Sequence, residues 1–299
     1  SISKVYAFII LGLLLSSYAL AGLSIDTLNP GYAPYLYGAC SAVLLLGMIG
    51  VGHNFVHHKQ NFFRFFFLAT GFTHNEWQIM HTLSHHIYPN MELDYETAAM
   101  EPVAYFLRNQ PENKFYTEII LNLVVVIIYP LNFLMKFLVT PLIKKQLPDF
   151  WYLVPTLVFF YFYACCGDWF YSLKLFLFIY CLFGLFLSRI LLCGHRVQYL
   201  WSEGAERIED FGEHTMASTG DTDTWITGFL SLLLLGGFNI HTPHHLFPTA
   251  DHAALYKMLP IVDRVCTRMG IKHYTSNRFA CYASFSKGLR TRIPFVRKN

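Results

Sequence analysis

Long apolar blocks constrain this chain more than any other feature of its sequence. Hydrophobic residues make up 54% of its 299 residues and charged residues only 14%, whereas a soluble domain carries about 25% charged residues. A helix needs roughly 20 mostly apolar residues to cross a bilayer. Four blocks come near that length and are taken as crossings: residues 5–25, 33–51, 150–165 and 171–193. The sequence therefore predicts an all-α integral membrane protein with about four transmembrane helices in one domain, residues 1–299.

Two further apolar stretches are predicted to lie along the membrane surface. Residues 61–72 are rich in Phe but too short to cross a bilayer, so we expect them in the interface. The block 119–139 contains Pro130, and counting it as a crossing would put the histidine clusters described below on opposite sides of the membrane. We therefore expect interfacial helices in both places. Residues 53–118 and 194–299 would then form a histidine-rich cap.

The distribution of basic residues indicates which way the cap faces. Lys144 and Lys145 follow the second interfacial block, and nine Lys or Arg residues lie between Arg264 and Asn299, where no acidic residue occurs. Short segments enriched in Lys and Arg stay on the cytosolic side of a membrane. The sequence therefore predicts that the cap lies in the cytosol.

Nine of the 14 histidines fall in three short stretches, His53–His58, His81–His86 and His241–His245. Within each stretch, spacings of three or four residues place imidazole rings on one face of a helix, so each group can point at a common centre. Neutral imidazole is a frequent ligand of iron, copper, zinc and nickel. Because eight such ligands exceed what one ion can use, we predict two metal ions.

Other polar residues could complete such a centre. Either His195 or His214 could supply a ninth ligand, and His58 could be either a ligand or a structural residue. His74, His252 and His273 are isolated and are interpreted as structural. Ligating histidines usually donate their second ring N–H to an oxygen. The acidic residues near the clusters that could accept it are Glu92, Asp94, Asp210, Glu213, Asp221 and Asp223.

The clusters carry a resemblance to a known family. His85–Asn90 reads H-H-I-Y-P-N and His241–Pro248 reads H-T-P-H-H-L-F-P. With the first cluster, these boxes resemble those of the membrane fatty-acid desaturases over about Ala33 to Tyr274. Within that family the chain looks most like the cytochrome b5-related, desaturase-like proteins, through the phrases Trp77–His81, Asp94–Glu96, Met100–Pro102 and Asp210–His214.

The resemblance implies a di-iron, dioxygen-dependent desaturase. It would place a double bond in a long acyl chain, carried as a lipid or as acyl-CoA and held in a narrow apolar channel. Electrons would come from cytochrome b5 and its NADH reductase, in the endoplasmic reticulum membrane, with no nucleic acid involved. A hydroxylase on the same scaffold, or a desaturase-like protein without that activity, is the alternative.

The resemblance also assigns the metal ligands position by position. They are His53 and His57 from the first box, His81, His85 and His86 from the second, and His241, His244 and His245 from the third. For the ninth position we favour His214, with His195 second.

The chain departs from the family pattern at three points. Asn54 stands where many desaturases have Asp, and the second box has one residue more than the usual H-x-x-H-H. The His-Pro-Gly-Gly haem motif of cytochrome b5 does not occur. The electron donor is therefore expected to be a separate protein or a domain upstream of Ser1.

Overall fold

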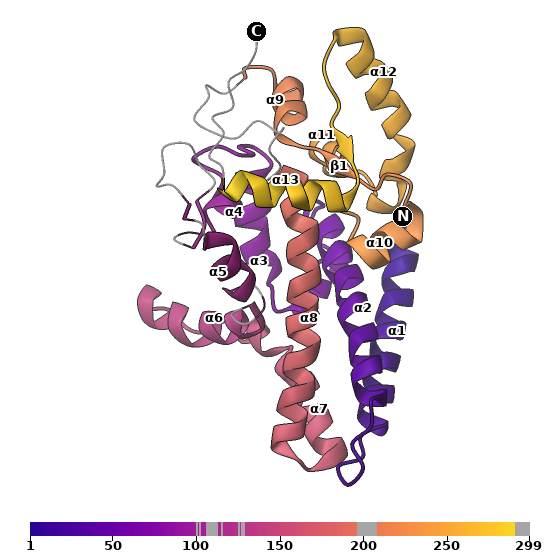
Figure 1. Cartoon of the computed structure of the whole chain (residues 1–299), viewed down its shortest axis with the longest axis vertical. Coiled ribbons are helices and arrows are strands. Elements are labelled where there is room, and N and C mark those ends of the chain that lie inside the picture. Colours follow the sequence, from indigo (N-terminus) through magenta and orange to yellow (C-terminus); the bar gives the residue numbers. More distant parts are fainter. Residues whose placement is uncertain are drawn as a thin grey trace.

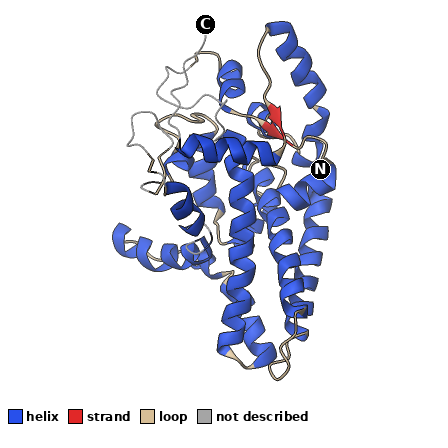
Figure 2. Ribbon diagram, in the orientation of Figure 1, coloured by secondary structure: helices blue, strands red, loops and turns tan. Residues whose placement is uncertain are grey.

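The protein is built almost entirely of helices (Figure 2). The computed structural model describes residues 1–99, 101, 103–105, 113–114, 116–124, 126, 129–195 and 208–290. The helices in chain order are α1 Ile2–Leu23, α2 Ala33–Val56, η1 Phe62–Thr70, α3 His74–Trp77, η2 Gln78–His85, α4 Tyr95–Ala98, α5 Thr117–Leu123, α6 Tyr129–Lys144, η4 Phe150–Leu153, α7 Thr156–Cys166, α8 Trp169–His195, α9 Phe211–Ser218, α10 Gly228–Leu235, α11 His241–Leu246, η5 His252–Lys257, α12 Leu259–Met269 and α13 Arg278–Arg290. Two short parallel strands, β1 Asp221–Thr222 and β2 Thr275–Ser276, pair with each other.

Three helices, α1, α2 and α8, are long and apolar enough to cross a membrane. They run side by side along the long axis of the molecule (Figure 1). Small residues of α2 permit close packing, because Gly47 meets Ile10 of α1 and Gly38 meets Ile179 of α8. The three helices coincide with the predicted blocks 5–25, 33–51 and 171–193, although α2 and α8 continue beyond the apolar blocks into the histidines.

The predicted fourth crossing, residues 150–165, is shorter in the structure. It consists of the 3-10 turn η4 followed by α7, which has 11 residues and a length of about 16 Å, against about 30 Å of bilayer hydrocarbon. Helix α7 packs against the start of α8 to form a hairpin through Gly167, which adopts a left-handed conformation with φ 68°. The count of four crossings stays a prediction.

The predicted Pro130 block is divided into two helices. Helix α5 ends at Leu123, and α6 begins at Tyr129 and extends sideways from the bundle (Figure 1). Its exposed side chains include Leu138, Leu142 and Ile143, and an ion pair between Lys136 and Glu76 of α3 ties it to the bundle. This orientation is the one that an interfacial helix requires.

The cap lies beyond one end of the long helices (Figure 1). Helices α2 and α8 both finish there, α13 packs across the end of α8, and α10 packs against α2. The pairing of β1 with β2 joins the segment before the third histidine box to the segment that leads into α13. The ends of two long helices and the loops between them therefore converge on one buried region.

Candidate metal centre

Four segments deliver histidines to the buried region of the cap. His53 lies in the last turn of α2, and His57 follows that helix directly. The second box lies on η2 and the residue after it, His195 is the last residue of α8, and the third box forms α11. Each segment is fixed by its packing in the bundle or cap, so the rings meet because helix ends meet.

Five of these histidines form a first metal-ligating group: His53, His57, His81, His86 and His244. Each offers one ring nitrogen, and these nitrogens lie within 4.8 Å of one another. The Nε2 atoms are 2.6 Å apart between His53 and His81, 2.9 Å between His81 and His86, and 3.1 Å between His86 and His244.

Four histidines form a second group around His195. The Nε2 atom of His195 lies 2.9 Å from that of His85, 2.6 Å from that of His241 and 3.1 Å from that of His245. A close helix contact makes this possible, because a Cβ added at Gly194 would lie 2.7 Å from the His241 ring. Glycine at position 194 therefore leaves room for a third-box ligand.

The extra residue of the second box is accommodated by a π-helix. Residues Gln78–His85 are π-helical, and the N–H of His86 donates to the carbonyl of His81, five residues earlier. A π-helical turn contains about one residue more than an α-helical turn, so His81 and His86, five residues apart, lie on the same side of the helix. The spacing H-x-x-x-H-H thus points His81 and His86 into the first group while His85 enters the second.

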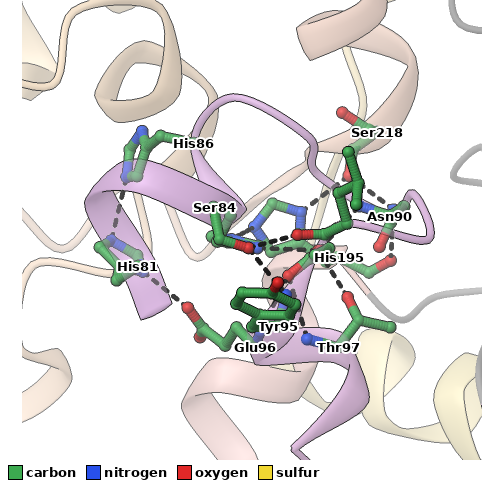
Figure 3. A network of polar contacts seen from close by, with 12 residues as sticks. His81, Ser84, His86, Asn90, Tyr95, Glu96, Thr97, His195 and Ser218 are labelled. Carbon is green, nitrogen blue, oxygen red and sulfur yellow. Dashed lines mark hydrogen bonds and ion pairs between the residues drawn. The ribbon is translucent and has the colours of Figure 1, made fainter. Parts of the chain in front are cut away.

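The outer ring nitrogens of three ligands, His81, His85 and His195, are held by oxygen atoms. The Nδ1 atom of His85 lies 2.9 Å from Oδ2 of Asp94, that of His81 lies 2.6 Å from Oε2 of Glu96, and that of His195 lies 2.9 Å from the carbonyl of Ser218. Figure 3 shows His81 between Glu96 and His86. With Nδ1 bound in this way, Nε2 is the atom that each ring presents to a metal.

Asn90 joins the second box to the end of α8. Its side-chain amide donates to the carbonyls of His195 (3.3 Å) and Ser218 (3.1 Å), and its backbone N–H donates to Asp94. Its φ of 61° is left-handed, a conformation that Asn adopts more readily than most residues. The Asn of the H-H-I-Y-P-N phrase therefore both bonds to the end of α8 and adopts the left-handed backbone of this turn.

His252, interpreted as structural from the sequence, contacts a metal-group residue. Its Nε2 lies 3.1 Å from Nδ1 of His244, and its backbone N–H donates to Oδ1 of Asn54. Asn54, the departure from the usual Asp, thus holds the segment that orients His244. The sequence held no signal for this role beyond the histidine's position shortly after the third box.

Burial keeps these rings neutral. It lowers the pKa of His241 to about 3 and holds the pKa values of His86, His244 and His245 well below their usual range. Burial alone would raise the pKa of Glu96, but the neighbouring imidazoles lower it to about 2. Neutral imidazole is the form that binds metal.

The donor set fits transition-metal ions. Two nitrogens bound to one ion at about 2.1 Å lie about 3 Å apart, which is close to the Nε2 separations within each group. His57 Nε2 is buried and has no hydrogen-bond partner in the described part of the chain. Uncharged nitrogen donors suit iron, zinc, copper or nickel rather than magnesium or calcium. Two groups can hold two ions.

The structure brings together eight of the nine predicted ligands and adds His195. His214 is buried on α9 but belongs to neither group, and exposed His58 also lies outside both. The geometry therefore favours His195 over His214 as the ninth ligand. Asp94 has the predicted outer role, whereas Glu96, which contacts His81, was missed although it belongs to a phrase noted in the sequence.

A charged network supports the third box from outside. Asp221 Oδ1 accepts the backbone N–H groups of His241 (2.6 Å) and Thr242 (2.7 Å), and its Oδ2 lies 2.9 Å from His273. His273 also contacts Asp263 at 2.7 Å. Burial opposes protonation of His273, but the two carboxylates raise its pKa to about 9. A cationic His273 therefore holds the carboxylate that fixes the start of α11.

Comparisons with known proteins agree with this geometry. The sequence model of the fatty acid desaturase family matches residues 29–277. The chain is 26% identical over 270 residues to the cytochrome b5-related protein of Drosophila melanogaster, covering 84% of this chain and 58% of that protein. It is 30% identical over 77 residues to the probable Delta(5) fatty acid desaturase C of Dictyostelium discoideum, covering 26% and 16%. The chain thus spans little more than half of the first relative, and no solved structure matches it.

Proposed function

Because this chain belongs to the fatty acid desaturase family, we propose that it is an oxidoreductase that introduces a double bond into a long acyl chain. The observation that carries the proposal is the convergence of nine buried or partly buried histidines in two groups. Two hydrogens from the acyl chain, with two electrons and two protons from a donor, would reduce one dioxygen to two waters.

We propose iron for both groups, held by His53, His57, His81, His86 and His244 in one and by His85, His195, His241 and His245 in the other. Bound iron would supply the activation of dioxygen that attack on an unactivated C–H bond requires. The chain's own part is to hold the rings and to exclude water. Trp77 and Phe238 contribute to this, since their rings lie 5.2 Å from His81 and 4.5 Å from His53.

An apolar cavity in the membrane part supports a long acyl substrate. Its volume is about 340 Å³. It is lined by the start of α7, by Tyr180 and by five residues of α1: Leu11, Leu14, Leu15, Tyr18 and Ala19. Ile10 of α1 packs against Gly47 of α2, and Ser17 hydrogen-bonds to Ser41. Gly47 precedes His53 by about 9 Å along α2, so this part of α1 lies at least that far from His53, toward the opposite end of the bundle from the cap. We propose that the cavity receives the far end of the acyl chain.

Helix α12 supports docking of cytochrome b5. It stands at the outer edge of the cap, away from the membrane helices (Figure 1). Its outer face exposes apolar side chains four residues apart with arginines between them: Ile261, Val265 and Met269, with Arg264 and Arg268. An apolar stripe flanked by positive charge fits an acidic protein partner. A cytosolic cap on the endoplasmic reticulum would make this face accessible.

The inner face of α12 connects that surface with the metal groups. Val262 and Cys266 pack in one cluster with Met216 and Leu246, and Leu246 follows His245 directly. An electron that reaches α12 would therefore have one layer of side chains to cross before the second histidine group.

Turnover by the purified protein tests the proposed function. In nanodiscs with cytochrome b5, its NADH reductase and dioxygen, we expect acyl chains to lose two hydrogens, detected by mass spectrometry. The His85→Ala variant should form no product, because it loses a ligand of the second group. An acyl product that gains an oxygen would instead establish a hydroxylase, and iron-loaded protein without any product would reject both activities.

Reduction by cytochrome b5 tests the docking face. The double variant Arg264→Gln/Arg268→Gln should be reduced about tenfold more slowly at low ionic strength and should lose most of its salt dependence. Both side chains are exposed, so its iron content and its reduction by dithionite should equal those of the parent. Equal rates with cytochrome b5 at every salt concentration would exclude this face.

A further inference from the structure

A second cavity, polar in character, lies beside the first histidine group. Its volume is about 480 Å³, and it is lined by Val56, His58, Lys59, Gln60, Arg64, His74 and Gln78. It lies where α2 ends, between η1 and the start of the second box. Its lining contains a lysine, an arginine and two histidines but no carboxylate, so it is deficient in hydrogen-bond acceptors for the cations it contains.

Two lining side chains have a buried polar atom without a hydrogen-bond partner. Arg64 Nε and His74 Nδ1 are buried and find no hydrogen-bond partner among the described residues. Arg64 also makes no ion pair there, and its guanidinium lies only 5.2 Å from the Phe65 ring centre. His74 is 7% exposed. Leaving such groups buried and unpaired is costly, so the cavity is built for an anion.

Asp149, the acidic side chain that acts on His74, does not supply that anion. Asp149 is close enough to oppose the lowering of the His74 pKa that burial and then the Arg64 charge produce. Its carboxylate is used to cap η4, where it accepts the N–H of Trp151 at 3.0 Å. The anion must therefore come from outside the described residues.

The cavity lies at the level of the membrane surface. Phe62 of η1 is 65% exposed, and Phe63 packs edge-on against Phe8 on the exposed side of α1. On the other side, Phe65 lies 5.9 Å from the half-exposed Trp151. Aromatic side chains of this kind mark the boundary between hydrocarbon and water. Lipid head groups occupy the same level.

The cavity is also next to the metal groups. His57, a member of the first group, stands in the chain between the lining residues Val56 and His58. A molecule held at Arg64 and Lys59 by its anionic end therefore has its other end free to pass the histidines. The apolar cavity lined by α1 and α7 lies further into the membrane.

We infer that this cavity binds a phosphate ester, the head of the carrier to which the substrate acyl chain is attached. That the attached acyl chain is the substrate rests on the proposed function. The phosphate binding itself does not. Arginine holds phosphate oxygens through two parallel N–H bonds, and lysine adds a point charge. The phosphate would satisfy Arg64 and His74 and set how far the acyl chain reaches past the histidines.

Binding of defined probes to the detergent-solubilised full chain tests this inference. The probes are dioctanoyl phosphatidylcholine, dioctanoylglycerol, which has the same chains without phosphate, and adenosine 3′,5′-bisphosphate. Tighter binding of the phosphatidylcholine than of the glycerol identifies a phospholipid carrier, and binding of the bisphosphate identifies a soluble nucleotide carrier. Arg64→Gln should weaken the phosphate-dependent binding about tenfold and leave dioctanoylglycerol binding unchanged.

Three variants control for charge and folding. Arg64→Lys should retain part of the affinity, Lys59→Gln should lose several-fold at an exposed position, and the remote, exposed Lys272→Gln should bind as the parent does. Binding that is indifferent to phosphate in the parent, or equal in Arg64→Gln and the parent, would overturn the inference. The titrations require neither iron nor turnover. A protein that binds phosphate but takes up no iron would therefore reject the desaturase and leave this site standing.

Discussion

Replacement of His195 by Ala is expected to remove about one iron per folded chain, whereas His214→Ala is expected to retain both. His195 Nε2 lies within 3.1 Å of the corresponding atoms of His85, His241 and His245. Loss of even an outer partner of a ligand costs roughly 10- to 100-fold in metal affinity, so loss of this central ligand should empty the second group. Elemental analysis of the monodisperse fraction measures the iron content per chain.

Three controls make the comparison decisive. His85→Ala should match His195→Ala, because both belong to the second group. Zinc must be measured together with iron, since zinc binds the same kind of ligand. His214 is fully buried, so His214→Ala is expected to lower the yield of folded protein without changing its iron content. Iron lost from His214→Ala but kept in His195→Ala would restore the ligand favoured from the sequence.

Gly50→Ala is expected to prevent the cap from closing on α2. A Cβ at position 50 would lie 2.5 Å from the Cα of Gly236, which is backbone and cannot rotate away. Gly236 and Gly237 both have positive φ, 60° and 76°, so the turn before the third box uses a backbone conformation that other residues rarely adopt. Overpacking of this kind costs about 1–3 kcal/mol or more, and here it would separate His53 from His244, its third-box partner in the first group.

Gly12→Ala is the matched control for Gly50→Ala. Gly12 lies in α1 with nothing within 4 Å of an added Cβ, and Ala is favoured over Gly in a helix by about 1 kcal/mol. Its thermal unfolding midpoint in detergent should stay the same or rise, while that of Gly50→Ala falls by several degrees together with the iron content. Equal midpoints for the two variants would show that α2 and the glycine turn do not pack as described.

The long helices were predictable because hydropathy and length decide whether a segment can cross a membrane. Residues 33–51 and 171–193 correspond to α2 and α8, but the helices continue to Val56 and His195. Those last turns contain polar residues that are buried by the cap, and a pattern based on apolarity ends before them. Helical spacing likewise placed the boxes correctly, but it could not reveal that Gln78–His85 is a π-helix.

The ninth ligand could not be predicted because it depends on three-dimensional closure. His214 was favoured for the phrase around it and its distance from the third box. The structure brings the last turns of α8 and α2 to the same end of the bundle, and there His195 lies against His241 and His245 of the third box. A histidine immediately after a spanning block, on the same side as the other boxes, was the signal available.

The way the two groups draw on the chain has a consequence for biosynthesis. Four of the five histidines of the first group lie before residue 87, and only His244 comes later. In the second group only His85 is early, and His195, His241 and His245 follow more than 100 residues afterwards. During translation the first group would be nearly complete before the third box leaves the ribosome, whereas the second would have only two of its four ligands, His85 and His195. The two ions would therefore be acquired in a set order, and a chain truncated before His241 would keep four ligands of one group and only two of the other.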